Sequence, residues 1–132
     1  MSSRFVRFVV TSPHETSQVR MGLFQAAADL REGGELTAAE LDLLSETTDW
    51  FNRNLDRPTR FSRKRNSYHR DQRAIAWFRD SAIDHIARMR ELGAILEQHG
   101  WVVEMLTASR PGYVVYEDEF QVIAEPFSET RA

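Results

Sequence analysis

Apolar and polar residues follow each other along the chain with two different periods, and these periods predict the order of its elements. Residues 4–11 are rich in β-branched and aromatic side chains, and Val6, Phe8 and Val10 would share one face of a strand. The Ser-Pro pair at residues 12–13 ends this strand, because a residue before proline and proline itself favour a turn.

Two helices are expected next. Apolar residues at helical spacing over residues 18–31 predict the first, and Gly22 weakens its first turn, so its start lies nearer Leu23. The second has the clearest start in the chain. Thr37 and Glu40 match a capping box, in which each side chain accepts a hydrogen bond from the backbone N–H of the other residue.

The longest predicted helix covers residues 71–99. Its buried side would consist of seven apolar positions at spacings of three and four: Ile75, Phe78, Ala82, Ile86, Met89, Leu92 and Leu96. Gly100 suits the left-handed position just past a helix end, where a Schellman cap would bring Trp101 against Leu96. We therefore predict one continuous helix over this stretch.

The last third of the chain is predicted as three strands, at residues 101–107, 113–116 and 120–125. An Arg-Pro-Gly-Tyr turn signal and an acidic Glu-Asp-Glu turn separate them, which favours an antiparallel meander. The fold expected is α+β, of order β-α-α-α-β-β-β. It has a four-stranded, mainly antiparallel sheet with three helices on one face, in a single domain covering residues 1–132.

Composition excludes several classes of protein. A chain of 132 residues is one domain by length, and it has no run of about 18 apolar residues that could span a membrane. Arg4 and Arg7 interrupt the N-terminal apolar stretch, which argues against a signal peptide. With no cysteine there is no disulfide framework and no thiolate nucleophile. We expect a bacterial-type, cytoplasmic protein.

The distribution of charge along the chain is its most informative feature for function. Residues 53–73, the basic segment, hold eight basic and two acidic residues, so they carry about +6 while the remainder carries about −9. Several arginines on one surface bind phosphates, and aromatic rings between them can stack on bases. Within a basic loop of about residues 56–71 and just beyond it, the candidate binding residues are Arg57, Arg60, Phe61, Arg63, Lys64, Arg65, Tyr68, Arg70 and Arg73.

Three interpretations of the basic segment remain open. It binds nucleic acid, it docks on an acidic protein surface, or it is a solvated, mobile loop whose charges pair with the acidic remainder of the chain or with nothing. The sequence holds no signature of a known nucleic-acid module. The leading hypothesis is a small non-enzymatic binding module for a polyanion, with nucleic acid first and an acidic protein second.

The alternative is a small enzyme with a pocket around Trp77, His85, Arg110 and Tyr113. His85 has acid–base capacity, although a buried structural histidine is the simpler interpretation. The four histidines, His14, His69, His85 and His99, lack the spacing of a metal motif, and no phosphate-binding or dinucleotide-binding glycine motif occurs. No metal or cofactor is therefore expected. The acidic turn would sit at a hairpin tip that points outward.

Several short runs carry a resemblance that extends over nearly the whole chain: Gly22-Leu23-Phe24, Asp49-Trp50-Phe51-Asn52, Trp77-Phe78-Arg79-Asp80-Ser81-Ala82, His85-Ile86 and Arg110-Pro111-Gly112-Tyr113-Val114-Val115-Tyr116-Glu117-Asp118. They resemble those of a set of short uncharacterised bacterial proteins. The resemblance implies a stand-alone small bacterial protein, and it transfers no activity and no catalytic residue.

Overall fold

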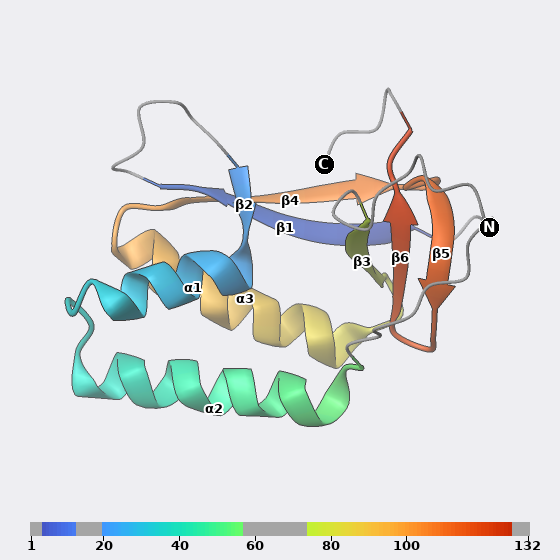
Figure 1. Cartoon of the computed structure of the whole chain (residues 1–132). Helices are drawn as coiled ribbons and strands as arrows, with labels where there is room; N and C mark the ends of the chain where they lie inside the picture. The colour runs from blue at the N-terminus through green and yellow to red at the C-terminus, as the bar shows by residue number, and fades with distance from the viewer. Residues whose placement is uncertain (1–3, 13–19, 57–73, 128–132) are drawn as a thin grey trace. The chain divides into compact units, whose positions relative to one another are not determined.

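The structure, a computed structural model, describes residues 4–12, 20–56 and 74–127. Its elements are β1 (Phe5–Thr11), β2 (Arg20–Gly22), α1 (Leu23–Glu32), α2 (Ala38–Asn54), β3 (Ile75–Arg79), α3 (Ile83–Gln98), β4 (Val102–Ala108), β5 (Tyr113–Glu117) and β6 (Gln121–Glu125) (Figure 1). The predicted α+β class and the three helices are confirmed. The predicted element order is wrong, and the described residues form a sheet of six strands instead of four.

Strand β1 has three partners in the sheet. Phe5 and Val6 pair antiparallel with β3, residues 9–11 pair antiparallel with β2, and β4 also pairs with β1. β3 continues to β6 and β6 to β5, which gives the order β2-β1-β3-β6-β5. The predicted meander is therefore only partly right, because β5 and β6 form a hairpin while β4 pairs with β1. Val9 and Val10 of β1 are buried, and buried backbone N–H and C=O groups must form hydrogen bonds. Pairing of β1 with neighbouring strands meets this requirement.

The chain forms two compact units, each built from segments that are distant in sequence. One unit consists of Met1–Arg7, Arg57–His85 and Leu106–Ala132, and the other of Phe8–Asp56 and Ile86–Met105. The chain passes from one unit to the other within β1, α3 and β4. In the ranges that the structure describes, no helix combines the length and the apolar character that crossing a membrane requires.

The continuous helix predicted over residues 71–99 is wrong. Residues 75–79 are strand β3, the chain turns at Asp80 and Ser81, and α3 begins only at Ile83. β3 pairs with β1 on one edge and with β6 on the other, and Trp77 and Phe78, which as consecutive residues point to opposite faces of the sheet, are both buried. A strand enclosed in this way shows no alternation of polar and apolar residues, so a short apolar run fits a helix equally well.

The first helix also starts later than the range 18–31 would give. Gly22 is the N-cap of α1, as its weak helix propensity suggested, and residues 20–22 form β2 instead of a helical turn. The predicted capping box of α2 is confirmed. The Glu40 N–H donates to Thr37 Oγ1 at 3.1 Å, and the Thr37 N–H donates to Glu40 Oε1 at 2.9 Å. That backbone donor lowers the pKa of Glu40, partial desolvation opposes the change, and His99 adds to the lowering.

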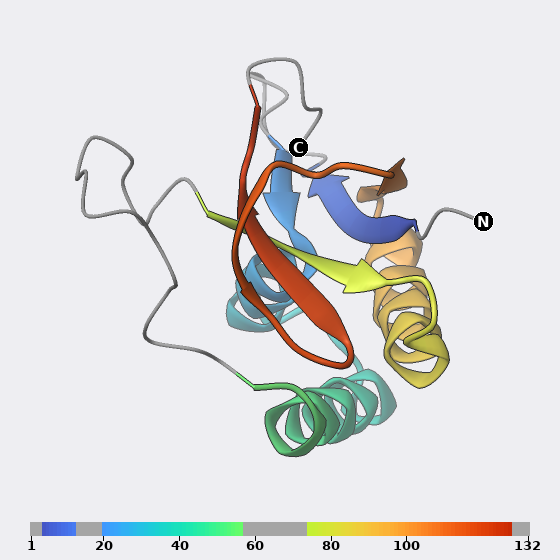
Figure 2. The ribbon, with the colours of Figure 1, turned by 90° about the vertical axis from the view of Figure 1, so that its right-hand side faces the viewer.

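Helices α2 and α3 run antiparallel in the unit that holds residues 8–56 and 86–105. His99, just past α3, lies 3.1 Å from Glu40 at the start of α2, while the Arg88 guanidinium in α3 lies 5.2 Å from the ring centre of Trp50, late in α2. Contacts that join early residues of one helix to late residues of the other require opposite directions. Figures 1 and 2 show all three helices on the same side of this unit's strands.

The end of α3 is confirmed as a Schellman cap. Gly100 has a φ of 88°, its N–H donates to the Glu97 carbonyl at 3.1 Å, and the Trp101 N–H donates to the Leu96 carbonyl at 3.1 Å. Both Leu96 and Trp101 are buried. The glycine stop in the sequence was therefore sufficient to locate this helix end.

Candidate functional site

The nine candidate residues of the basic segment, from Arg57 to Arg73, lie outside the residues that the structure describes. The structure shows the two points where this stretch joins the fold. On one side, α2 ends with Leu55 as its C-cap, and the Leu55 N–H donates to the Phe51 carbonyl at 2.9 Å. On the other side, β3 begins at Ile75.

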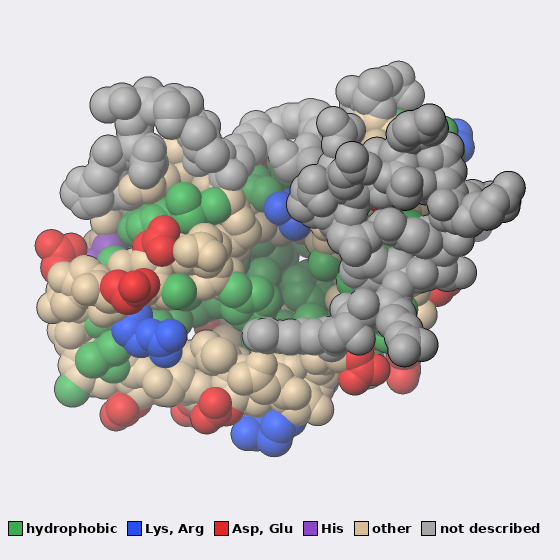
Figure 3. Space-filling view, in the orientation of Figure 1, with side chains coloured by type: hydrophobic (Ala, Val, Ile, Leu, Met, Phe, Trp, Pro, Cys, Tyr) green, Lys and Arg blue, Asp and Glu red, His purple; other side chains and the backbone are tan. Residues whose placement is uncertain are grey.

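The described part of the chain is acidic. It holds nine basic and seventeen acidic residues, and Figure 3 shows Asp and Glu side chains at several places on the face that it draws. Several of its arginines have partners within the protein. Arg79 forms a 2.6 Å ion pair with Glu117, and Arg88 lies over the Trp50 ring. Half-buried Arg7 donates a hydrogen bond from its Nη1 to the Ala76 carbonyl oxygen at 3.4 Å, and burial lowers the pKa of its guanidinium.

Two residues of the alternative pocket are buried. Trp77 is 2% exposed on β3, and His85 is 3% exposed in the first turn of α3. The His85 ring lies 4.3 Å from the ring centre of Phe120, in the turn of the β5–β6 hairpin, and 6.0 Å from that of Phe78. These ring contacts fit a packed structural histidine.

The other two residues of that pocket belong to the opposite end of the same hairpin. Arg110 is exposed, and Tyr113, the first residue of β5, is 63% exposed. Because β5 is five residues long, its two ends are about 13 Å apart at the usual rise of a strand. The structure therefore brings Arg110 near Tyr113 and His85 near Phe120, in two separate clusters. The enzyme alternative stays a prediction.

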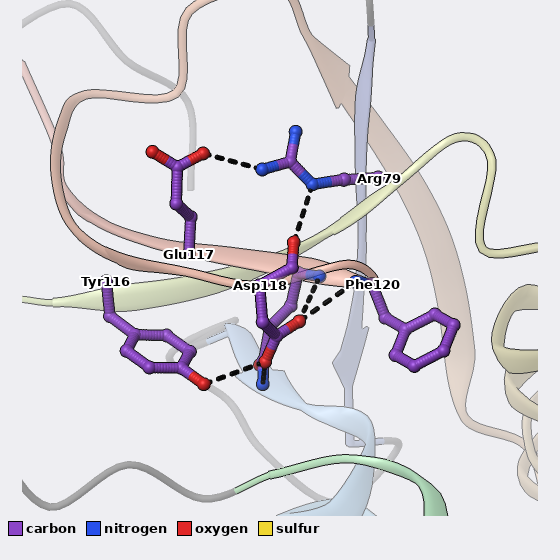
Figure 4. A network of polar contacts seen from close by, with 6 residues as sticks. Arg79, Tyr116, Glu117, Asp118 and Phe120 are labelled. Carbon is purple, nitrogen blue, oxygen red and sulfur yellow. Dashed lines mark hydrogen bonds and ion pairs between the residues drawn. The ribbon is translucent and has the colours of Figure 1, made fainter.

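At the turn end of the hairpin, a network of hydrogen bonds is centred on Asp118 (Figure 4). Asp118 Oδ1 accepts hydrogen bonds from the N–H groups of Phe120 at 2.9 Å and Gln121 at 3.1 Å. Its Oδ2 accepts from the Tyr116 hydroxyl at 2.9 Å and from Gln121 Nε2 at 3.1 Å. Arg79 completes the network, since its Nε donates to the Asp118 carbonyl oxygen at 2.8 Å.

These contacts determine the ionisation of Asp118. Burial on its own raises the pKa of this carboxyl, but the hydrogen bonds from Phe120, Gln121 and Tyr116 outweigh burial, so the pKa lies below its usual value. An ionised carboxylate that accepts four hydrogen bonds stabilises the turn and is poorly suited to transfer protons. Of the three acidic residues of the turn, Glu117 and Glu119 are exposed, whereas the Asp118 carboxylate is directed to donors within the turn.

The open end of the hairpin carries an aromatic cluster that contains a residue missed by the sequence analysis. The rings of Tyr113 and Phe127 meet edge to face with centres 4.7 Å apart, and the Arg110 guanidinium lies 5.2 Å from the centre of the Phe127 ring. Phe127 follows Pro126 directly after β6, and only the pairing of β5 with β6 reveals that it lies beside Tyr113. We call Arg110, Tyr113 and Phe127 the aromatic cluster.

Within the described ranges, no three His, Asp or Glu side chains converge as metal ligands. Comparison of the chain with protein-family models, with curated proteins and with solved structures finds no match. The resemblance to short bacterial proteins thus stays a prediction, and functional arguments rest on the chemistry of the residues themselves.

Proposed function

We propose that the protein is a small non-enzymatic binding module that uses the basic segment to bind a polyanion, with nucleic acid as the first candidate. The observation that carries this proposal is the separation of charge along the chain, about +6 in residues 53–73 against about −9 elsewhere. Neutralising phosphates with arginine or lysine releases condensed counterions, which is the main source of affinity in such contacts.

The charge of the described part supports assigning the phosphate contacts to this segment. Its exposed arginines, Arg4, Arg31, Arg53, Arg90 and Arg110, are distributed over different elements, and Arg53 belongs to the basic segment itself. Seventeen acidic residues accompany them. A polyanion is repelled by such a surface, so its attachment must involve the residues between α2 and β3.

Charge reversal tests the proposal. The triple variant Arg63→Glu, Lys64→Glu, Arg65→Glu should lose binding to labelled nucleic acid at about 50 mM salt, where phosphate contacts are strong. The matched control is Arg4→Glu, Arg31→Glu, Arg90→Glu, which changes the net charge equally at exposed positions outside the segment. We expect the control to retain most of the binding, and circular dichroism to find both variants folded.

Salt dependence separates binding from catalysis. The logarithm of the association constant should fall linearly with the logarithm of salt concentration, whereas turnover of a small molecule by the enzyme alternative should not. A parent protein that binds no nucleic acid at about 50 mM salt rejects the nucleic-acid form of the proposal. An acidic protein surface then becomes the first candidate partner of the same segment.

The proposed compartment is the bacterial cytosol. This part of the proposal rests on the cysteine-free composition, which needs no oxidising environment, and on the resemblance to short bacterial proteins. Fractionation of the native host tests it, since the protein should accompany cytosolic markers and co-purify with nucleic acid at low salt. Recovery in a membrane or secreted fraction would contradict it.

A further inference from the structure

Tyr113 is the most exposed aromatic residue of its hairpin. All five residues of β6 are buried, and the aromatic residues Tyr116, Phe120 and Phe127 are half-buried, although Val114 and Glu117 of β5 are also exposed. Tyr113, by contrast, leaves 63% of its surface to solvent and is joined by the exposed Arg110. Burying a tyrosine ring would contribute to folding, so a ring kept in solvent beside a guanidinium is better explained by a contact with another molecule.

The backbone around the cluster is closely built. Gly112 has a φ of 151°, and a Cβ at this position would collide with the backbone carbonyl of Glu125. Pro111, before it, is buried. Glycine is thus required just before β5, where the backbone of residue 112 approaches that of Glu125. Arg110 and Tyr113 lie on either side of this close approach.

The chemistry of the cluster fits an unpaired base. Aromatic rings and arginine guanidinium groups both stack on bases, whose faces are accessible in a single strand and covered in a duplex. Glu125 pairs with Tyr113 across the hairpin but is only 9% exposed, so its carboxyl is not presented to a ligand on the surface.

We infer that Arg110, Tyr113 and Phe127 form a stacking platform for a base of single-stranded nucleic acid. The inference rests on the proposed function, which it deepens by naming the strand type. The basic segment supplies affinity for phosphates of any nucleic acid, and the platform adds a contact that a duplex cannot make. The protein therefore prefers single strands to duplexes of equal length.

Fluorescence anisotropy with the full chain tests this. The probes are a labelled oligothymidylate of about 12 nucleotides, a length that one small domain can cover, and a duplex of the same length. Tyr113→Ala should weaken binding to the oligothymidylate by about tenfold, within the range for loss of one stacked base. Binding to the duplex should be unchanged, and Tyr113→Phe, which keeps the ring, should behave as the parent.

Three further variants extend the test. Val114→Ala removes apolar surface from the neighbouring, 45% exposed residue of the same strand, and should leave both affinities unchanged. If Tyr113→Ala fails to fold by circular dichroism, Tyr113→Leu retains apolar bulk without an aromatic face and should show the same selective loss. Arg110→Gln should weaken binding to the oligothymidylate and leave binding to the duplex unchanged, because it removes the guanidinium face that stacks on a base.

The outcomes distinguish this inference from the proposed function. Unchanged single-strand binding by Tyr113→Ala, or an equal loss on the duplex, overturns the platform. Charge reversal in the basic segment would still abolish binding in that case, and the proposed function would stand. A parent protein that binds neither probe overturns both.

Discussion

At the turn end of the β5–β6 hairpin, the Asp118 carboxylate accepts four hydrogen bonds from its own turn and the Phe120 ring packs on buried His85. At the open end, Tyr113 is 63% exposed, and Arg110 extends over the ring of Phe127. The same hairpin thus has a carboxylate with internal partners at one end and an exposed aromatic ring at the other.

The difference separates residues that hold the fold from residues that are available for binding. Removing a carboxylate that accepts hydrogen bonds on both oxygens lowers the stability of the protein, because the donors are left without their acceptor. An exposed ring costs little to remove, since water already surrounds most of it. The sequence alone favoured neither end, because both contain charged and aromatic residues.

The largest effect is expected from Gly112→Ala at the open end. The added methyl group would overlap the Glu125 backbone at a φ of 151°, so we expect the free energy of unfolding to fall by about 3 kcal/mol or more. Gly34→Ala is the control, because Gly34 has a φ of 73° but no atom near its would-be Cβ, and it should cost only about 1 kcal/mol. Chemical denaturation measures both, and equal losses would contradict a close backbone approach at Gly112.

Asp118→Ala should be nearly as severe, by about 3 kcal/mol, since it leaves two backbone N–H groups, the Tyr116 hydroxyl and the Gln121 amide without their acceptor. Glu119→Ala changes an exposed carboxylate of the same turn and should stay within about 0.5 kcal/mol of the parent. A denaturation midpoint for Asp118→Ala close to that of Glu119→Ala would mean that the network does not hold the hairpin.

Acid should weaken the turn end selectively. The folded-state pKa of Asp118 is lowered, so its contribution to stability is present above the unfolded-state value of about 3.9 and is lost as pH falls towards the folded-state value. Thermal midpoints measured from about pH 6 to pH 2 should therefore fall less steeply for Asp118→Asn than for the parent. Parallel curves would exclude Asp118 as a source of acid sensitivity.

Thr37→Ala provides a reference outside the hairpin. Loss of the Thr37 Oγ1 acceptor from the capping box should lower the free energy of unfolding by about 1 kcal/mol at an unchanged denaturant slope. Ser45→Ala, at an exposed position within α2, should have almost no effect. If Thr37→Ala leaves the midpoint unshifted, the start of α2 is not held by this cap.

The smallest effect is expected from Tyr113→Ala, the variant that should matter most for binding. Its ring makes one edge-to-face contact with Phe127 and is otherwise largely solvated, so a loss of about 0.5 to 1 kcal/mol is expected. Thermal denaturation of Tyr113→Ala and Asp118→Ala under the same conditions compares the loss of stability at the two ends of the hairpin. A loss as large as that of Asp118→Ala would show that the open end also holds the fold.

Local signals in the sequence were enough for three of the helix ends, although they did not locate the start of α3. The capping box at Thr37, the glycine before Leu23 and the Schellman glycine at Gly100 depend on residues within one turn of each other, and all three are confirmed. The same holds for the strands of the last third, which have strong β propensity and short turn signals between them. The charge of the basic segment is likewise a property of composition.

The candidate site was less accessible to such reasoning. Arg110 and Tyr113 flank the same turn in the sequence, but Phe127 joins them only through the register of β5 and β6. His85 and Trp77 were assigned to the same pocket, and the structure places His85 at the other end of the hairpin. Sequence proximity brings turn neighbours together, whereas residues on different strands meet only once the sheet is paired.

The α+β class, three helix ends, the C-terminal strands and the separation of charge could thus be derived from the order of the amino acids, because each depends on residues close together in the chain. The strand conformation of residues 75–79 in β3 and of residues 20–22 in β2, and the pairing of β4 with β1, depend instead on contacts between distant residues. A buried strand owes its conformation to hydrogen bonds with distant partners. The apolar run around Trp77 and Phe78 fits a helix or a strand alike, and its pairing with β1 and β6 selects the strand.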